Sequence, residues 1–213
     1  MSGREDREKQ IRDLQAILRA AQGISPETLA ARISDIGFKC LGCGQCCCGQ
    51  DNSVVVFPFE IRAIQAAMGL QWLDVVSPPE EGEWDRKGCF HTLEWRLKKE
   101  GGSCRFYQNG RCSVYRARPM LCTTYPFYLD NCVLMCSECR GLGGQIESCE
   151  ADKMAELLIL RYLFEIQEAI ALLERYQDFE RGEAKKGGGC IVHDSEGEHR
   201  IVGEELFGWD HRL

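Results

Sequence analysis

Apolar residues recur at helical spacing in two segments that precede the first cysteines. Residues 5–22 carry them three and four positions apart with charged residues between, which predicts an amphipathic helix. A second helix should follow, because Ser25 can cap its first turn, Pro26 suits its first position and Gly37 can end it. A pair of helices is therefore expected to lead into the central region.

Shorter elements are predicted beyond this pair. Residues 54–57 form an apolar run typical of a short buried strand, and Pro58 opens a helix that should stop at Gly69. Between residues 88 and 126 short β pieces alternate with turn signals such as Asn109-Gly110. These features predict short β-hairpins.

Cys104 and Cys112 flank the Asn109-Gly110 turn. Facing residues of a hairpin have neighbouring side chains, so one hairpin is expected to bring the two sulfurs to the same side. Cys122 follows ten residues later.

The C-terminal part combines a helix with a hairpin. Residues 151–181 predict a long helix with a wide apolar stripe, which indicates a core helix. Gly187–Gly189 form a flexible joint, and residues 190–193 should pair with residues 199–202.

The predicted fold class is α+β: a single metal-organised domain whose irregular cysteine-rich centre has short hairpins and lies between helices. We divide the chain into an N-terminal helical segment (1–37), a cysteine-cluster metal-binding domain that includes the long helix (38–182), and a glycine joint with a C-terminal hairpin or tail (183–213).

Composition narrows the possible functions. With 213 residues, 44% of them hydrophobic, the chain can bury a core without help from a metal. Its net charge of −7 and the lack of a basic patch argue against nucleic acid as a partner. The chain begins with a charged segment and has no apolar run of the roughly 20 residues that span a bilayer, so we expect a cytoplasmic protein without a membrane partner.

Fourteen cysteines fall in clusters, and five of them lie within residues 40–48. Two-residue spacers between Cys40, Cys43 and Cys46 let their thiolates converge from one turning loop, which Gly42 and Gly44 make easier to fold. Adjacent cysteines cannot form a disulfide without severe strain. The spacing therefore favours a metal site in a reducing compartment over a disulfide scaffold.

Two metal chemistries remain open for these cysteines. The triple spacing is the one that a ferredoxin-like loop uses for three corners of an iron–sulfur cluster, and Cys104, Cys112 or Cys122 could supply the fourth ligand. Four-cysteine zinc sites also use such pairs. We favour iron–sulfur because only four histidines are present, and His91 is expected to be a surface or packing residue.

Cys132, Cys136 and Cys139 have the spacing of radical S-adenosylmethionine enzymes. The β/α barrel that should accompany this motif is not predicted, because only a helix and a hairpin follow. Besides Cys139, the remaining cysteines of this part are expected to be auxiliary ligands or small buried hydrophobes: Cys132, Cys136, Cys149 and Cys190.

Several motifs between residues 38 and 145 resemble the YkgJ-type CxxCxxCC cysteine-cluster family of zinc- or iron-chelating proteins. These are Phe38–Cys47, Val54–Ile61, Cys104–Tyr107, Gly110–Tyr115, Arg118–Phe127 and Cys139–Gly144. One departure is Arg140, which stands where the family often has proline. The resemblance implies eight metal ligands: Cys40, Cys43, Cys46, Cys47, Cys104, Cys112, Cys122 and Cys139.

Neighbours of these ligands have expected supporting roles, each with a plain structural alternative. Arg118 could stabilise thiolate charge or form a surface ion pair. Residues 125–128 could exclude water or belong to the core. The glycines of residues 141–144 could let backbone N–H groups approach sulfur, or simply form a turn. Cys48 is expected to be a bystander.

We therefore predict a protein that binds an iron–sulfur cluster, with 4Fe-4S favoured and one or two clusters possible, and that serves in electron transfer or in the maturation or modification of a partner protein. A similarity to flagellin lysine N-methylase implies one alternative, a cluster-dependent S-adenosylmethionine protein methyltransferase. A zinc-stabilised interaction module without catalysis is the other. Catalytic residues stay unassigned.

Overall fold

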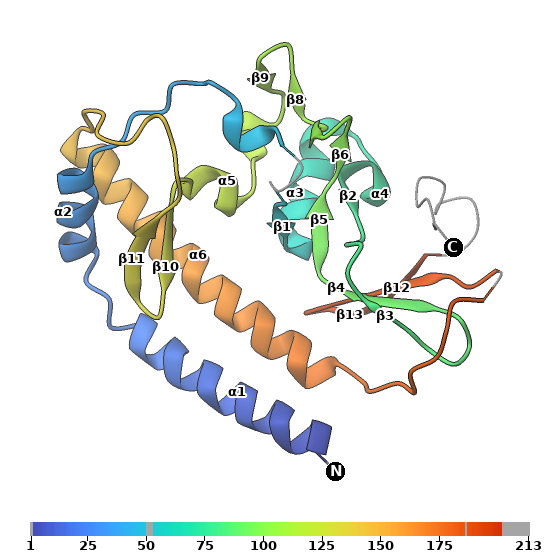
Figure 1. Cartoon of the computed structure of the whole chain (residues 1–213). Helices are drawn as coiled ribbons and strands as arrows, with labels where there is room; N and C mark the ends of the chain where they lie inside the picture. Colours follow the sequence, from blue (N-terminus) through green and yellow to red (C-terminus); the bar gives the residue numbers. More distant parts are fainter. Residues whose placement is uncertain (1, 50–52, 186, 202–213) are drawn as a thin grey trace.

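The computed structural model describes residues 2–49, 53–185 and 187–201 (Figure 1). Its helices are α1 (Ser2–Ala21), α2 (Pro26–Ile36), α3 (Pro58–Met68), α4 (Trp72–Val75), α5 (Met120–Thr124) and α6 (Ser148–Arg175), with short 3₁₀ turns η1 (Gln45–Cys47) and η2 (Tyr115–Ala117).

Its strands are short. They are β1 (Val55–Val56), β2 (Val76–Ser77), β3 (Glu83–Trp84), β4 (Phe90–Leu93), β5 (Trp95–Leu97), β6 (Lys99–Glu100), β7 (Ser103–Cys104), β8 (Tyr107–Gln108), β9 (Arg111–Cys112), β10 (Phe127–Asp130), β11 (Val133–Cys136), β12 (Cys190–Asp194) and β13 (Gly197–Ile201). The predicted α+β class is confirmed, with helices at both flanks and a cysteine-rich centre.

The helix boundaries follow the capping residues. Ser25 Oγ accepts a hydrogen bond from the Thr28 N–H at 3.1 Å, and the Gly37 N–H closes α2 on the Ile33 carbonyl at 2.9 Å. Helix α3 lies between Pro58 and Gly69, as predicted. None of the described helices combines the length and apolar composition that a membrane span requires.

The predicted end of the long helix is wrong by six residues, because α6 stops at Arg175 rather than near Arg181. The following residues run extended beside β3. The Arg86 N–H donates to the Glu180 carbonyl at 3.0 Å, and the Gly182 N–H donates to the Trp84 carbonyl at 2.7 Å. Pairing with a strand that is distant in sequence replaces the last helical turns.

One core joins the N-terminal helices to α6. Helices α1 and α2 pack against α6, and the β10–β11 hairpin lies against the same helix (Figure 1). Ile33, Phe127 and Leu158 are almost fully buried there. Burial of such side chains is worth about 1.5–3 kcal/mol each, so this helical core has its own source of stability.

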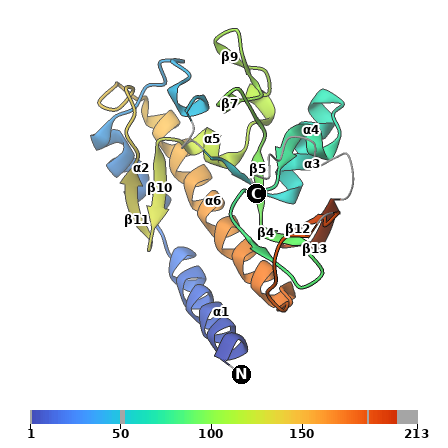
Figure 2. The same cartoon turned by 45° about the vertical axis from the view of Figure 1, so that its right-hand side comes forward.

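A second core lies under the small sheets. Strands β1, β5 and β2 form one sheet, and β13, β12, β4 and β3 form another, of which Figure 2 labels β13, β12 and β4. Trp95 and Ile61 are buried between these sheets and α3. We call this the sheet core and the first one the helical core.

The C-terminal hairpin is confirmed, with Cys190 opposite Ile201 and Asp194 opposite Gly197. Val202, which the prediction included, lies outside the described residues. Strand β12 also pairs in parallel with β4, so this hairpin completes the larger sheet.

The prediction that one hairpin holds both Cys104 and Cys112 is wrong. Cys112 pairs with Tyr107 in the β8–β9 hairpin, whereas Cys104 pairs with Lys99 in the β6–β7 hairpin. Each short ribbon closes around its own glycine-containing turn, so the expected longer hairpin divides into two.

Candidate metal centre

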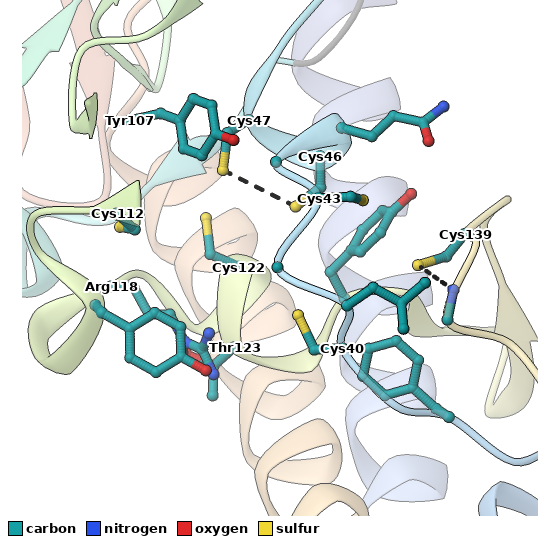
Figure 3. A pocket seen from close by; sticks show the side chains of 18 of the residues that line it. Cys40, Cys43, Cys46, Cys47, Tyr107, Cys112, Arg118, Cys122, Thr123 and Cys139 are labelled. Atoms are coloured by element: carbon teal, nitrogen blue, oxygen red, sulfur yellow. Dashed lines mark hydrogen bonds between the residues drawn. The ribbon is translucent and has the colours of Figure 1, made fainter. Parts of the chain in front are cut away.

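All eight predicted ligand cysteines line one cavity of about 880 Å³. They are free thiols, and they come from the loop after α2, from β7, β9 and α5, and from the loop after β11. Figure 3 shows seven of them around the cavity. Segments up to 100 residues apart in sequence thus present sulfur to the same space.

The loop of residues 40–48 bends tightly beside the Tyr107 ring. Gly44 has a left-handed backbone with φ of 70° and is buried, and a Cβ at this position would overlap the Tyr107 ring. Only glycine suits both conditions. This glycine lets the chain turn into η1, which places Cys46 and Cys47 beside each other at the cavity.

A backbone clamp holds this loop against the segment that carries Cys139. The Lys39 N–H donates to the Gly141 carbonyl at 2.9 Å, and the Gly143 N–H donates to the Gly37 carbonyl at 3.0 Å. The Gly141 N–H also lies 3.4 Å from Cys139 Sγ, as expected for a backbone amide that supports sulfur. The glycines therefore serve both close packing and sulfur contact.

We expect Gly141→Ala to lower stability by about 1–3 kcal/mol, because the added Cβ would overlap the Lys39 carbonyl, which is backbone and cannot rotate away. Urea unfolding would measure the change. Gly23→Ala is the matched control, since its Cβ would meet the nearest backbone oxygen at an ordinary 3.4 Å. Equal stability of the two variants would contradict the clamp.

Helix α5, which carries Cys122, is anchored at both ends. The buried Glu60 carboxylate accepts the N–H of Met120 at 2.7 Å, together with the N–H of Phe57 at 3.0 Å. At the other end, Arg161 Nη1 donates to Thr124 Oγ1 at 2.8 Å. Glu60 and Arg161 thus position Cys122, and the sequence predicted neither role.

A Glu in the first turn of α3 could have indicated part of the Glu60 role, because a carboxylate there can accept the N–H of the residue before the helix, here Phe57. The contact with Met120 joins residues 60 positions apart, and no local pattern indicates it.

The thiols differ in acidity because their surroundings differ. The Cys47 thiol, with its sulfur 3.9 Å from Cys46 Sγ, and the positive charge of Arg118 lower the pKa of Cys46 to about 6. The same contact raises the pKa of Cys47, and burial raises the pKa of Cys122 to about 12. At neutral pH the metal-free site thus holds Cys46 as a thiolate beside protonated Cys47 and Cys122.

Metal affinity should therefore increase with pH. Binding to Cys47 and Cys122 displaces their protons, and these two thiols alone weaken binding about 100-fold for each pH unit below their pKa values. Cys46 adds little above pH 7, because its thiolate already predominates. Chelator competition at pH 6.5 and 7.5 would measure the slope, and an affinity that does not change with pH would contradict this acidity pattern.

Arg118 lies beside the cavity in a defined position. Its guanidinium is 4.0 Å from the centre of the Tyr115 ring, and its Nε donates to Thr123 Oγ1 at 3.2 Å (Figure 3). The expected role near thiolate charge is consistent with its effect on Cys46.

Of the aromatic segment at residues 125–128, Tyr125 lines the cavity, and its hydroxyl donates to the Glu138 carbonyl beside Cys139. Phe127 is buried in the helical core against Phe38, with ring centres 5.8 Å apart. Phe127 thus belongs to the core, whereas Tyr125 lies at the cavity, where the expected exclusion of water requires an apolar ring.

The other cysteines considered as auxiliary ligands do not line the cavity. Cys190 is buried in the sheet core and Cys132 packs on the helical core, whereas Cys136 and Cys149 are exposed. Cys132, Cys136 and Cys139 have the spacing of radical S-adenosylmethionine enzymes, and of these three Cys139 alone lines the cavity. Cys48 also lies outside the lining, as expected.

His91 is a packing residue, as predicted, and lies away from this site. Its Nδ1 is 2.8 Å from His193 Nε2, and its Nε2 is 3.3 Å from Asp85 Oδ2.

The donor set fits a metal that prefers soft ligands, because every predicted ligand is a thiol. Within the described ranges, no three His, Cys, Asp or Glu side chains lie close enough together to hold a single ion. The sulfurs line one larger space, in which Cys46 Sγ and Cys47 Sγ lie 3.9 Å apart.

Comparison with known proteins agrees with this chemistry. The model of the CxxCxxCC family, described as a "putative zinc- or iron-chelating domain", matches residues 39–140. No solved structure matches the chain. The matched region contains all eight cavity cysteines and supports binding of zinc or iron. Residues 39–140 thus match the family model that the sequence motifs resemble.

Proposed function

We propose that the chain binds iron–sulfur, with 4Fe-4S as the favoured cluster type, in the eight-cysteine cavity. The observation that carries this proposal is the arrangement of the eight thiols around one space without a compact three-ligand group among the described residues. An iron–sulfur cluster spreads its thiolates over several irons, whereas zinc draws four ligands to one point. The wide arrangement therefore favours a cluster.

Surrounding residues suit such a cofactor. Arg118 supplies positive charge, and the Gly141 N–H approaches sulfur. Hydrogen bonds to sulfur and nearby charge are among the features that set cluster potential. Cys40, Cys43 and Cys46 are exposed, so electrons or a partner protein can approach from this side. This exposure supports electron transfer, or the maturation or modification of another protein.

Anaerobic purification with iron, zinc and acid-labile sulfide analysis tests the proposal. We expect iron and sulfide in similar amounts, with visible charge-transfer absorption. Stoichiometric zinc without sulfide, in protein that has also been offered ferrous iron and sulfide, would reject the cluster and establish the zinc-stabilised module.

A methyltransferase that uses S-adenosylmethionine is a second candidate, favoured by the size of the cavity. Its volume of about 880 Å³ lies within the range of small-molecule sites, and its wall includes Leu121, Ile146 and Met154 besides the thiols. Calorimetry with S-adenosylmethionine and cluster-loaded protein separates the candidates. Absence of binding heat would reject the methyltransferase and leave the cluster proposal intact.

A further inference from the structure

Adjacent Cys46 and Cys47 both line the cavity, with their sulfurs 3.9 Å apart. Each iron of a cubane cluster takes one cysteine thiolate. Two sulfurs at this distance also fit one tetrahedral ion. The pair therefore marks where the two groups of cysteines described below meet.

The other ligands divide between two structural supports. Cys40 and Cys43 follow Phe38, and Cys139 precedes Leu142, where Phe38 and Leu142 form a backbone bridge and pack on the helical core. The clamp between Lys39 and Gly141 joins the same two segments. This side of the cavity is thus a unit attached to the helical core.

Cysteines on the opposite side are attached to the sheet core, Cys122 only in part. Cys104 and Cys112 pack against this core from β7 and β9. Cys122 lies on α5, which Glu60 of α3 holds at its start and Arg161 of α6 holds at its end. These attachments do not involve the glycine clamp.

Figure 3 shows the same division. Cys47, Cys112 and Cys122 lie toward one side of the view, whereas Cys43 and Cys139 lie toward the other. Cys46 lies between the two groups, joined to Cys47 by the dashed line.

We propose that the cavity holds two four-thiolate centres that share the Cys46–Cys47 step. The outer centre has Cys40, Cys43, Cys46 and Cys139, and the inner centre has Cys47, Cys104, Cys112 and Cys122. This inference rests on the proposed metal binding and adds the number of centres and the ligands of each.

Exposure distinguishes the two centres. Three outer ligands are exposed, namely Cys40, Cys43 and Cys46, whereas the four inner ligands are at least partly buried. Solvent reaches exposed thiolates more readily, so the outer centre should lose its metal first to a chelator. The outer centre is then the one that meets a partner, and the inner centre is the protected one.

Native mass spectrometry of the full chain, reconstituted anaerobically with ferrous iron and sulfide, directly tests the number of metal centres in each chain. We expect the mass of two cubane clusters, or about eight irons per chain. A fully loaded wild-type protein that carries one cluster would overturn the inference. This measurement does not depend on how any variant folds.

Paired variants test the ligand assignment. We expect Cys40→Ser/Cys139→Ser and Cys104→Ser/Cys112→Ser each to retain half of the wild-type iron. Cys136→Ser/Cys149→Ser is the matched control, because both cysteines are exposed and outside the cavity, and it should retain all of it. Complete loss of iron from both cavity variants, with wild-type circular dichroism, would indicate one shared centre.

The type of metal centre and the number of centres are tested separately. Zinc without sulfide would reject iron–sulfur, and the zinc count would still decide the present inference. Two zinc ions per chain, halved by each paired variant, would support two centres, and one ion would overturn them.

Discussion

Cys122→Ser is expected to reduce the bound metal by at least half. Cys122 is a partly buried thiol that faces the cavity from α5, and a serine hydroxyl is a poor ligand for soft metals. Structural metal sites are worth about 10–16 kcal/mol over four ligands. Loss of one thiolate should therefore weaken its centre by about 100-fold. Metal analysis of purified protein would measure the loss.

Cys149→Ser provides the comparison for this substitution. Cys149 is exposed in the first turn of α6 and does not line the cavity, so its replacement should leave the metal content unchanged. Unchanged loading of Cys122→Ser would remove Cys122 from the ligand set. Equal losses in both variants would indicate a general effect of removing a thiol.

Glu60→Ala should destabilise the fold by about 2–4 kcal/mol and also lower metal loading. The substitution leaves the N–H groups of Phe57 and Met120 without their acceptor in a buried place, and each unpaired group costs about 1–3 kcal/mol. Because Met120 begins α5, the position of Cys122 should also be lost. Urea unfolding and metal analysis would measure the two effects.

Two control variants show how much of the Glu60→Ala effect comes from loss of the carboxylate itself. Glu156→Ala removes an exposed carboxylate from α6 and should change stability by less than about 0.5 kcal/mol. Glu60→Gln keeps the shape and one acceptor oxygen. Its free energy of unfolding and its metal content should therefore lie between those of the wild type and of Glu60→Ala. Wild-type stability and metal content in Glu60→Ala would contradict the proposed anchoring of α5.

Local sequence signals predicted the separate elements well where those signals are strong. Ser25, Pro26 and Gly37 determine α2 through capping and backbone preference, which act within one turn of helix. The end of α6 was not predictable in this way. Its apolar stripe continues past Arg175, and strand pairing by residues 180–182 outweighs further helix formation.

The candidate site was also predictable only in part. Cysteine spacing predicts a metal-binding loop, and the resemblance to the CxxCxxCC family nominates all eight cysteines that line the cavity. Their supports were not predictable, because Glu60, Arg161 and Tyr107 act through contacts between distant segments. A residue type shows which atoms can bind metal, but it does not show what holds them in place.

Thiol-rich spacing and glycine-containing turns are local properties of the chain, so the sequence is sufficient to indicate a thiol donor set and the helices around it. The tertiary structure was needed to show that Cys104 and Cys112 reach the cavity from two hairpins, and that a backbone clamp joins the segments of Cys40 and Cys139. These placements depend on packing against two separate cores, which bring together segments that no short-range preference relates.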